Sequence, residues 1–383
     1  MSLIECGSRV SSGVDPLIAT SYDQAVFAYR NGHQKSQAQL VSVEGLDPGW
    51  TAYNCTPMVG GDGNLHLLSR VEPLDTEVSQ VKKLGFISCP TSPRSFVAPN
   101  GLVIAEAQDP SISLITPDKT VIGVVAITED LAVRGKVAAY WPELYEFGDE
   151  GVRREKVAIG PKSQKDIRVA YVGSFGEQDL SVIVTRERQE NGRNIRSYLQ
   201  VGIVPTTGDM QLLSRDIVKI KKDPTSRLDV LSPDNRTWFG PNQIIPLQSQ
   251  EGDLVFGLLF HTGRWTNRLY ENGERGKDYK AFVTEISADP ETMQVTHFTR
   301  PKVIATVDDL PYTEAKRPNL EKVLFPGGFV FGIRRGLVEQ TILVCGLRDR
   351  YNCLVRRDYP FSRPLDVKLN RLSVLPVEKM PNG

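Results

Sequence analysis

The chain has 383 residues, and 40% of them are hydrophobic, which is ample for a large core. Lysine plus arginine and aspartate plus glutamate number 46 each, so the formal net charge is zero. Because there is no basic excess and no basic run, neither a nucleic acid nor an anionic membrane is expected as the main partner.

Strand patterns dominate the chain, and helical patterns are short. The two candidate helices, at residues 21–26 and 319–323, do not sustain helical apolar spacing over a dozen residues. One unit recurs: an apolar strand, a turn rich in Gly, Asp, Asn or Glu, and an alternating second strand, as expected for antiparallel hairpins. Its turns fall at 61–63, 99–101, 176–179, 251–253 and 336–340.

Five such units imply roughly 75 residues each, more than the ~40–50 of a typical propeller blade, and loop insertions would fill the difference. A sandwich or barrel is usually complete by about 250 residues, so radial repetition fits this many strands better. We therefore predict an all-β protein in which residues 1–383 form a single five-bladed β-propeller domain with irregular loops. The polar stretch 219–236 is expected to cross the surface between two blades.

The most unusual stretch is residues 53–81, YNCTPMVGGDGNLHLLSRVEPLDTEVSQV. Pro73 cannot donate a ladder hydrogen bond, so the second strand of this hairpin should end there. Polar side chains at the junction of strand and loop often carry chemistry. They can equally form a structural salt-bridge cluster, and the pattern leaves both readings open. The side chains concerned are Asn54, Arg70, Glu72, Asp75 and Glu77.

Further polar sets recur at predicted strand ends. Lys165 and Arg168 precede the strand at 169–172 and could hold a phosphate, the arginine through paired hydrogen bonds and the lysine as a point charge. A solvated charge run is the alternative, and a lone histidine that ends an apolar strand, as His261 does, is more often structural. No single set is specific, but their recurrence favours one shared site. The other sets contain Arg186, Asn242, Tyr279 and Asp349.

Several common sites are not expected. The glycine-rich turn at 60–63 has neither the mononucleotide nor the dinucleotide phosphate-loop spacing, and there is no G-x-S-x-G or HExxH motif. Five cysteines without a CxxC pair argue against a disulfide framework and a zinc site. The N-terminal residues lack the pattern of a secretory signal, and the apolar runs are too short to span a bilayer, so a reducing cytoplasm is the expected location.

Nine sequence blocks occur in order over about residues 53–361: YNCTP, SRVEPLDTEVSQV, KDIRV, VTRERQ, WFGPNQ, LLFHTG, KDYKAF, RPNLEKVLFPGG and LVCGLRDR. With them the chain resembles the five-bladed β-propeller β-1,2-mannosyltransferases and mannan phosphorylases of bacteria and protozoa, formerly a family of unknown function. The patterns RVEP-x-D-[TS]-E-x-S-x-V and RP-x-L-E-x-V-x-FPGG are the most specific.

The resemblance implies inverting transfer of mannose between a β-1,2-mannan oligosaccharide and either phosphate, which gives mannose 1-phosphate, or a nucleotide sugar such as GDP-mannose. One carboxylic acid handles the proton of the sugar oxygen while phosphate attacks the opposite face, without a metal or other cofactor. The phosphate ligands it implies are Lys165, Arg168 and Arg186. The substrate-binding residues it implies are Asn54, Arg70, Glu72, Asn242, His261, Tyr279 and Asp349.

One departure concerns the catalytic acid. The family carries an acidic residue in an Asp-Pro pair at the start of the second hairpin, and the register we expect puts Ser92-Pro93 there. A serine cannot act as a general acid, so the catalytic position would hold Ser92 and a second carboxylate would have to compensate. Asp75 is the first choice, with Glu72 and Asp109 as the others. The alternative to an enzyme is an inactive paralogue that binds carbohydrate or serves as an interaction scaffold.

Overall fold

The computed structural model describes residues 22–32, 37–87, 95–97, 103–130, 133, 135–148, 151–158, 165–191, 194–231, 237–249, 252–271 and 273–381. These residues form several β-sheets and two α-helices, so the all-β prediction is confirmed. None of the helices in the described part of the chain is long and apolar enough to cross a membrane.

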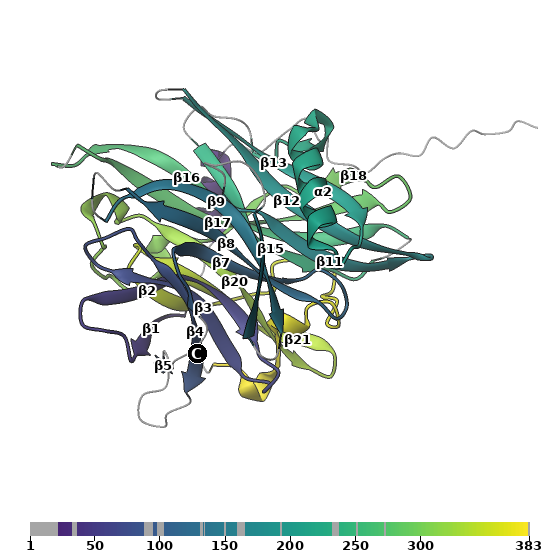
Figure 1. The fold of residues 1–383 in the computed structure, drawn as a ribbon, viewed down its shortest axis with the longest axis horizontal. Coiled ribbons are helices and arrows are strands. Elements are labelled where there is room, and N and C mark those ends of the chain that lie inside the picture. The colour runs from purple at the N-terminus through teal and green to yellow at the C-terminus, as the bar shows by residue number, and fades with distance from the viewer. Residues whose placement is uncertain are drawn as a thin grey trace, which may run out of the picture.

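The largest sheet unites the two ends of the described chain (Figure 1). Its strand order is β2-β3-β4-β5-β1-β22-β21-β20-β23, with β6 beside β4. β1 joins the halves, because it runs antiparallel to β22 and parallel to β5. The strands are β1 (Ala38–Glu44), β2 (Trp50–Val59), β3 (Leu65–Pro73), β4 (Gln80–Ile87), β5 (Ser95–Val97), β6 (Val103–Ile104), β20 (Leu324–Arg334), β21 (Leu337–Leu347), β22 (Tyr351–Arg357) and β23 (Val374–Pro376).

Three smaller antiparallel sheets follow one another along the chain. The first contains β7 (Ala107–Leu114), β8 (Thr120–Glu129), β9 (Val137–Gly148) and β10 (Gly151–Ala158). The second contains β11 (Arg168–Phe175), β12 (Gln178–Asn191), β13 (Asn194–Pro205) and β14 (Arg227–Leu228). The third contains β15 (Thr237–Pro246), β16 (Leu254–Leu269), β17 (Arg275–Asp289), β18 (Gln294–Phe298) and β19 (Lys302–Ala305).

Five strands form a closed ring at the centre. β2 contacts β7, β7 contacts β11, β11 contacts β15, β15 contacts β20, and β20 contacts β2 again. Five hydrophobic clusters fill the spaces between successive groups of strands around this ring. β16 shows why the sequence packs this way, since alternate side chains of a strand point to opposite faces: Phe256, Leu258 and Phe260 join one cluster, and Val255 and Leu259 join the next.

The predicted hairpins are largely present. The turn at 61–63 joins β2 to β3, and β3 ends at Pro73 as expected. Residues 176–177 connect β11 to β12, residues 335–336 connect β20 to β21, and residues 252–253 precede β16. The turn expected at 99–101 lies outside the described residues.

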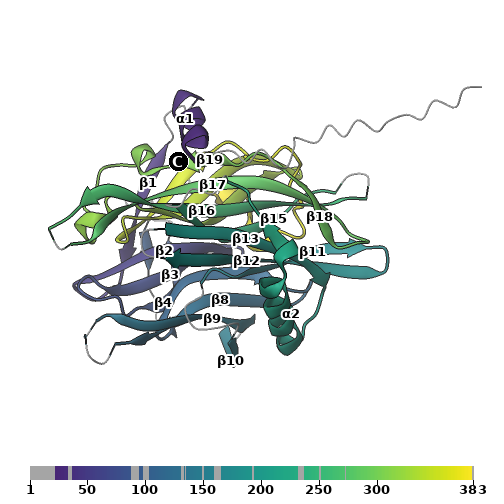
Figure 2. The same cartoon turned by 90° about the horizontal axis from the view of Figure 1, so that it is seen from above.

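The helices differ from expectation. α1 (Tyr22–Gly32) confirms a helix near residues 21–26 and is longer, whereas residues 319–323 contain only the short 3-10 turn η3 (Pro318–Leu320). No helix was predicted at α2 (Met210–Lys222), and the prediction that residues 219–236 cross the surface is wrong for 219–222, which end this helix. Asp209 caps this helix, and the buried side chains Met210, Leu213, Ile217 and Ile220 recur at helical spacing. Figure 2 shows α1 and α2 on different sides of the molecule.

A segment near the C-terminal end of the described chain lies against the ring. Its short helix η4 (Arg371–Ser373) contacts β2, β7 and β20. Asn370 donates to the carbonyl of Pro246 at the end of β15 (2.7 Å), and Gln243 donates to the hydroxyl of Ser373 (3.0 Å). The remaining 3-10 turns are η1 (Pro224–Ser226), η2 (Val307–Asp309) and η5 (Val377–Lys379).

Candidate active site

The inner strands are interrupted by bulges where they face the centre of the ring. Pairing between β2 and β3 shifts between Tyr53 and Thr56, and pairing between β7 and β8 shifts between Gln108 and Ser111. A bulge leaves residues unpaired and re-aims their side chains. Asn54 (φ 48°) and Asp109 (φ 47°) lie in these bulges in the left-handed conformation, which Asn and Asp tolerate better than other side-chain-bearing residues.

Two glycines let the bulge of β2 pack closely on its neighbours. A Cβ atom on Gly346 would lie 2.2 Å from Oδ1 of Asn54, and one on Gly327 would lie 1.5 Å from the carbonyl oxygen of Cys55. Any side chain at either position would therefore push Asn54 and its bulge out of place. The same two glycines occur in the blocks LVCGLRDR and RPNLEKVLFPGG.

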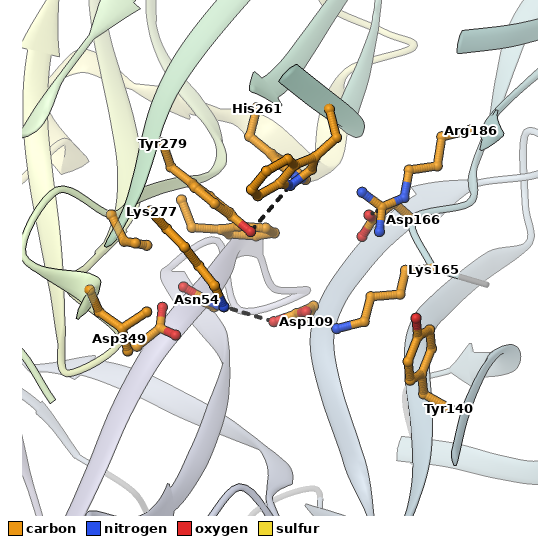
Figure 3. Close-up of a pocket in the computed structure, with 14 residues that line it drawn as sticks. Asn54, Asp109, Tyr140, Lys165, Asp166, Arg186, His261, Lys277, Tyr279 and Asp349 are labelled. Carbon is orange, nitrogen blue, oxygen red and sulfur yellow. Dashed lines mark hydrogen bonds and ion pairs between the residues drawn. The ribbon is translucent and has the colours of Figure 1, made fainter. Parts of the chain in front are cut away.

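A pocket of about 240 Å³ lies next to the bulges that contain Asn54 and Asp109 (Figure 3). Its charged lining consists of three carboxylates, from Asp109, Asp166 and Asp349, and three cations, from Lys165, Arg186 and Lys277. Such a mixed lining suits a ligand that is polar and carries negative charge in one part only. The other lining residues are Asn54, Tyr140, Trp238, His261, Tyr279, Leu320, Val323 and Phe325.

Asp109 is one of the pocket carboxylates whose position is fixed by contacts with neighbouring side chains. It is 6% exposed, and its Oδ1 accepts a hydrogen bond from Nδ2 of Asn54 at 3.1 Å. Nη1 of Arg70 lies 3.7 Å from the same oxygen. A buried carboxylate that is held by one amide and one guanidinium, and still faces a cavity, is suited to exchange a proton with a ligand there.

A cationic wall lies across the pocket from β2. The side chain of Arg186 pairs with Asp166 through Nε and Oδ2 at 3.1 Å. Burial alone would raise the pKa of Asp166, but nearby positive charges, that of Arg186 above all and also that of Arg168, outweigh it and lower the pKa. Lys165 lies over the ring of Tyr140, with Nζ 4.9 Å from the ring centroid, and burial lowers its pKa while Asp109 and Asp166 oppose that shift.

The aromatic side of the pocket is built around His261. Its ring is nearly parallel to that of Tyr279, with centroids 5.6 Å apart, and lies 4.9 Å from that of Phe325. Nδ1 is 2.9 Å from Oδ1 of Asn242, an atom that can only accept, so with the amide in this orientation Nε2 of a neutral ring is an acceptor. Burial lowers the pKa of His261 to about 4, so the ring is neutral near pH 7.

Lys277 and Asp349 complete the lining on the side of β17 and β21. Nζ of Lys277 lies 5.5 Å from the ring centroid of Trp265, and burial lowers the pKa of the lysine. Burial raises the pKa of Asp349, although the charges of Arg70 and Lys277 oppose this. Asp349 takes a left-handed conformation (φ 51°) in the turn that follows β21.

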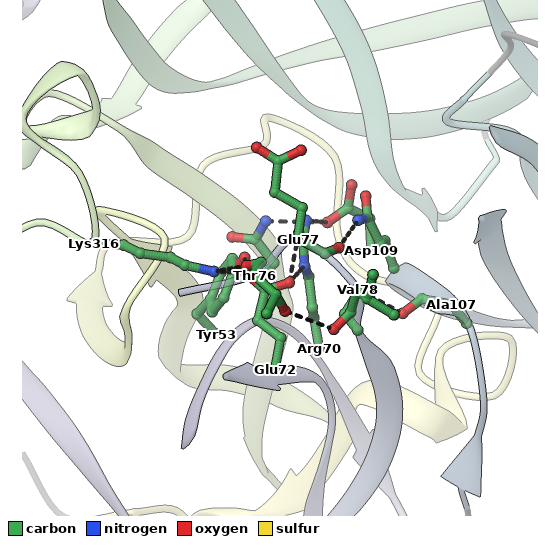
Figure 4. A network of polar contacts seen from close by, with 12 residues as sticks. Tyr53, Arg70, Glu72, Thr76, Glu77, Val78, Ala107, Asp109 and Lys316 are labelled. Carbon is green, nitrogen blue, oxygen red and sulfur yellow. Dashed lines mark hydrogen bonds and ion pairs between the residues drawn. The ribbon is translucent and has the colours of Figure 1, made fainter. Parts of the chain in front are cut away.

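A charged network lies behind Asp109 (Figure 4). Glu72 is fully buried and accepts hydrogen bonds from Arg70, from the hydroxyl of Tyr53 and from the ammonium of Lys316. Lys316 also donates to the carbonyl of Thr76 at 2.6 Å, so it ties the segment before β20 to the loop after β3. The charged residues of the stretch 53–81 therefore pair with one another, as the salt-bridge reading expects, and Arg70 also lies 3.7 Å from a pocket carboxylate.

The residues predicted for the site fall into three groups. Asn54, Lys165, Arg186, His261, Tyr279 and Asp349 line the pocket. Arg70, Glu72, Arg168 and Asn242 are buried behind it. Arg168 donates to the carbonyls of Asn242 (2.7 Å) and Ile167 (2.9 Å), so its guanidinium supports the backbone rather than facing the cavity. Asp75 lies in an exposed turn away from the pocket, and Ser92 lies outside the described residues.

Several lining residues were not selected from the sequence. Asp109 was considered only as a substitute acid, and Tyr140, Asp166, Trp238 and Lys277 were not among the predicted site residues. A signal for Asp109 was available, because Asp109-Pro110 stands inside a strand-like run and proline within a sheet occurs at edges or bulges. This Asp-Pro pair lies in β7, the first strand of the second sheet.

Across the described residues, no cluster of three His, Cys, Asp or Glu side chains could hold a metal ion. The described cysteines Cys55, Cys345 and Cys353 are buried free thiols.

Comparison with known proteins gives a family and a fold. The profile of the family described as "Protein of unknown function (DUF1861)" matches residues 28–363. A search of curated proteins finds no significant match. Similar solved structures include MPT-4, a mannose phosphorylase from Leishmania mexicana in complex with phosphate ion, at 23% identity and a TM-score of 0.65 over 88% of this chain and 93% of that one.

Two other solved structures are comparable. MPT-1, a GDP-Man-dependent mannosyltransferase from Leishmania mexicana, is 22% identical with a TM-score of 0.61, covering 89% of this chain and 96% of that one. A hypothetical protein from Leishmania major is 23% identical with a TM-score of 0.62, covering 92% and 99%. At these identities the likeness establishes a common fold.

Proposed function

The chain belongs to the DUF1861 family, and from that membership and the pocket at the centre of its ring we propose that it is an inverting mannoside phosphorylase or mannosyltransferase. The observation that carries the proposal is the pairing, in one cavity, of the buried carboxylate Asp109 with the cations Lys165 and Arg186. A phosphorolytic site needs both: an acid for the leaving oxygen and positive charge for the attacking phosphate.

The fold we propose for residues 1–383 is a single five-bladed β-propeller. The closed ring β2-β7-β11-β15-β20 and the five clusters between successive groups of strands support it. In this arrangement β1 closes the last blade against β22 and so fastens the two ends of the described chain together.

Asp109 is proposed as the proton donor. Phosphorolysis of a β-mannoside would break the bond between the anomeric carbon and the glycosidic oxygen, and the proton of Asp109 would pass to that oxygen, directly or through a sugar hydroxyl. A phosphate oxygen would form the new bond from the opposite face, giving α-mannose 1-phosphate. In the reverse direction Asp109 would take the proton back as a general base.

Lys165 and Arg186 are proposed as phosphate ligands. Arg168 is not proposed for that role, because its guanidinium donates hydrogen bonds to backbone carbonyl groups. Arg186 already pairs with Asp166, so its position is fixed before a ligand arrives. Lysine with a lowered pKa remains an effective donor as long as it is charged, and a phosphate beside Lys165 would restore its charged form. Asn54, His261, Tyr279 and Asp349 are proposed to contact the sugar.

The β-1,2 linkage, the oligosaccharide substrate and the cytoplasmic location are proposed from the family resemblance. Solved structures of the same fold include one mannose phosphorylase with phosphate and one GDP-Man-dependent mannosyltransferase, so both donors need a test. The inactive paralogue loses its main support, because the site retains a buried carboxylate in an Asp-Pro pair.

The decisive experiment incubates the full chain with a β-1,2-mannan oligosaccharide and inorganic phosphate and follows mannose 1-phosphate by ³¹P NMR. A parallel reaction supplies GDP-mannose and an acceptor oligosaccharide and follows GDP. Reactions without phosphate, and with Asp109→Asn, are the controls. Product in either reaction that depends on Asp109 supports the proposal. No product in both, at enzyme concentrations comparable to the substrate, would overturn it.

A further inference from the structure

We propose that Arg348 is a positioning residue: it holds the turn between β21 and β22 in an unfavourable backbone conformation and so presents the carboxylate of Asp349 to the sugar in the pocket. The inference rests on the proposed function for the identity of that ligand. Arg348 itself is not among the residues that line the pocket.

The turn has a conformation that its residues do not favour. β21 ends at Leu347 and β22 begins at Tyr351, and the amide of Arg350 donates to the carbonyl of Leu347 at 3.0 Å. The two residues enclosed by this hydrogen bond, Arg348 (φ 55°) and Asp349 (φ 51°), are both left-handed. Two consecutive left-handed residues are characteristic of a type I′ turn, for which Asn-Gly, Asp-Gly and Gly-Gly are the preferred pairs. An Arg-Asp pair therefore costs free energy at this position.

The other end of β21 carries a turn of the same kind, which we call the reference turn. Arg334 pairs with Leu337 across the hairpin of β20 and β21, and Arg335 (φ 53°) and Gly336 (φ 79°) lie between them. The first residue is an arginine in both turns, and the second is glycine in one and aspartate in the other. Gly336 adopts the left-handed conformation without a steric cost, and a Cβ on it would meet nothing within 4 Å. The reference turn therefore isolates the backbone cost of aspartate.

The contacts of Arg348 offset this cost at the pocket. Its side chain is 8% exposed. Nε donates to the carbonyl of Glu321 at 2.9 Å, and Nη1 donates to the carbonyl of Thr313 and, at 3.2 Å, to its hydroxyl oxygen. The backbone amide of Arg348 donates to the carbonyl of Val323 (2.8 Å), and its carbonyl accepts from the amide of Lys316 (3.0 Å). All four partners lie between β19 and β20, so Arg348 fixes the turn to that segment.

Asp349 is the part of the turn that reaches the ligand. It lines the pocket, and Figure 3 shows its carboxyl group on the side where Lys277 lies. The cations proposed for phosphate are elsewhere, since Lys165 precedes β11 and Arg186 lies on β12. A carboxylate repels phosphate and accepts hydrogen bonds from hydroxyl groups. Asp349 is therefore suited to the uncharged sugar.

The first test measures stability and needs no ligand. Asp349→Gly should raise the thermal midpoint by about 1–4 °C, because glycine removes the cost of the left-handed conformation. Gly336→Asp makes the opposite exchange in the reference turn and should lower the midpoint by a similar amount. Asp349→Asn removes the charge but keeps a side chain, so it should give a smaller rise than Asp349→Gly.

The second test measures phosphorolysis with β-1,2-mannobiose and inorganic phosphate as substrates. Arg348→Met keeps a long side chain but removes the donors that fix the turn, so KM for mannobiose should rise about 10–100-fold, as when a charged hydrogen bond to a ligand is lost. KM for phosphate should not change. Arg348→Lys keeps the charge and should recover part of the loss. Arg335→Met, the matched variant at an exposed position of the reference turn, should leave both KM values unchanged.

A higher midpoint for Asp349→Gly, together with a raised KM for mannobiose alone in Arg348→Met, supports the inference. A merely structural role for Arg348 would lower the midpoint without separating the two KM values. If Arg348→Met does not fold, Arg348→Lys is measured instead and should separate them in the same direction, by less.

Three results overturn the inference. The midpoint of Asp349→Gly can stay at or below that of the parent, Asp349→Asn can gain as much as Asp349→Gly, or the KM values can fail to separate. The midpoints need no turnover, so they decide whether the turn is strained even if no mannose transfer is found. Conversely, transfer that depends on Asp109 but has the same KM for mannobiose in Arg348→Met leaves the proposed function standing and removes this inference.

Discussion

Replacement of Asp109 by asparagine is the most informative single change. Asparagine has the same size and tolerates the left-handed conformation at this position (φ 47°), so the bulge of β7 should persist. Its amide oxygen can still accept the 3.1 Å hydrogen bond from Asn54. What the variant loses is the exchangeable proton and the charge that faces Arg70.

The expected loss follows from those two facts. Removing a general acid typically costs about 10²–10⁴-fold in rate, which corresponds to about 3–5 kcal/mol in the activation barrier because each factor of ten is about 1.4 kcal/mol. The loss should appear in kcat. KM for phosphate should change little, since Lys165 precedes β11 and Arg186 lies on β12, outside the bulge of β7. Asp109→Ala should also lower the free energy of unfolding relative to Asp109→Asn, because an alanine in the left-handed conformation costs about 1–3 kcal/mol.

The assay compares parent and variant with a β-1,2-mannan oligosaccharide and with an aryl β-mannoside whose leaving group departs without a proton. The oligosaccharide reaction should show the full loss, and the aryl mannoside reaction a much smaller one, because only the first needs the acid. Equal losses on both substrates would mean that Asp109 holds the sugar and does not protonate it. A variant within tenfold of the parent on the oligosaccharide would refute the assignment.

Three further predictions concern the surroundings of the pocket. Gly327→Ala should destabilise the fold by about 1–3 kcal/mol through overpacking against Cys55, whereas Gly61→Ala, whose Cβ would meet nothing within 4 Å, should leave the thermal midpoint almost unchanged; equal midpoints would contradict the close approach. His261 has its pKa lowered by burial to about 4. The stability it contributes is therefore present above pH 6.5 and lost as pH falls towards 4, by roughly 3 kcal/mol. Denaturant unfolding at pH 7 and 4.5 should show a steeper loss for the parent than for His261→Gln, and parallel losses would contradict the buried neutral ring. Ser92→Asp should not change activity if Asp109 is the acid, and a clear gain of activity would return Ser92 to the catalytic position.

The fold class could be predicted from the sequence because strand patterns and turns depend on residues that are close together in the chain. The turns at 61–63 and 176–179, and the end of β3 at Pro73, follow from residue types whose backbone preferences need no tertiary context. α2 was also readable in principle, since Met210, Leu213, Ile217 and Ile220 recur at helical spacing behind the cap residue Asp209. It was missed because its lysine-rich end looks like a surface connector.

The site was harder to read because it is assembled from several strands far apart in sequence. Within the block KDIR, Lys165 faces the cavity while Arg168 turns behind it, and no local pattern distinguishes the two. The inward turn of Asp109 depends on a bulge, which breaks the alternation on which strand readings rely. Family resemblance supplied the expectation of an Asp-Pro pair, and the strand arrangement places the pair Asp109-Pro110 in the first strand of the second sheet.

The segment that contains Asn370 and η4 has a consequence for the shape of the substrate. It touches the inner strands away from the pocket, at the end of β15 and beside β2, β7 and β20. We infer that this segment closes one end of the ring, so that a ligand enters from the other end. A linear polymer would then enter by its terminus, because its middle would need a second opening through which the rest of the chain could pass. If the ligand is a mannan, we expect the protein to shorten or lengthen chains one end unit at a time.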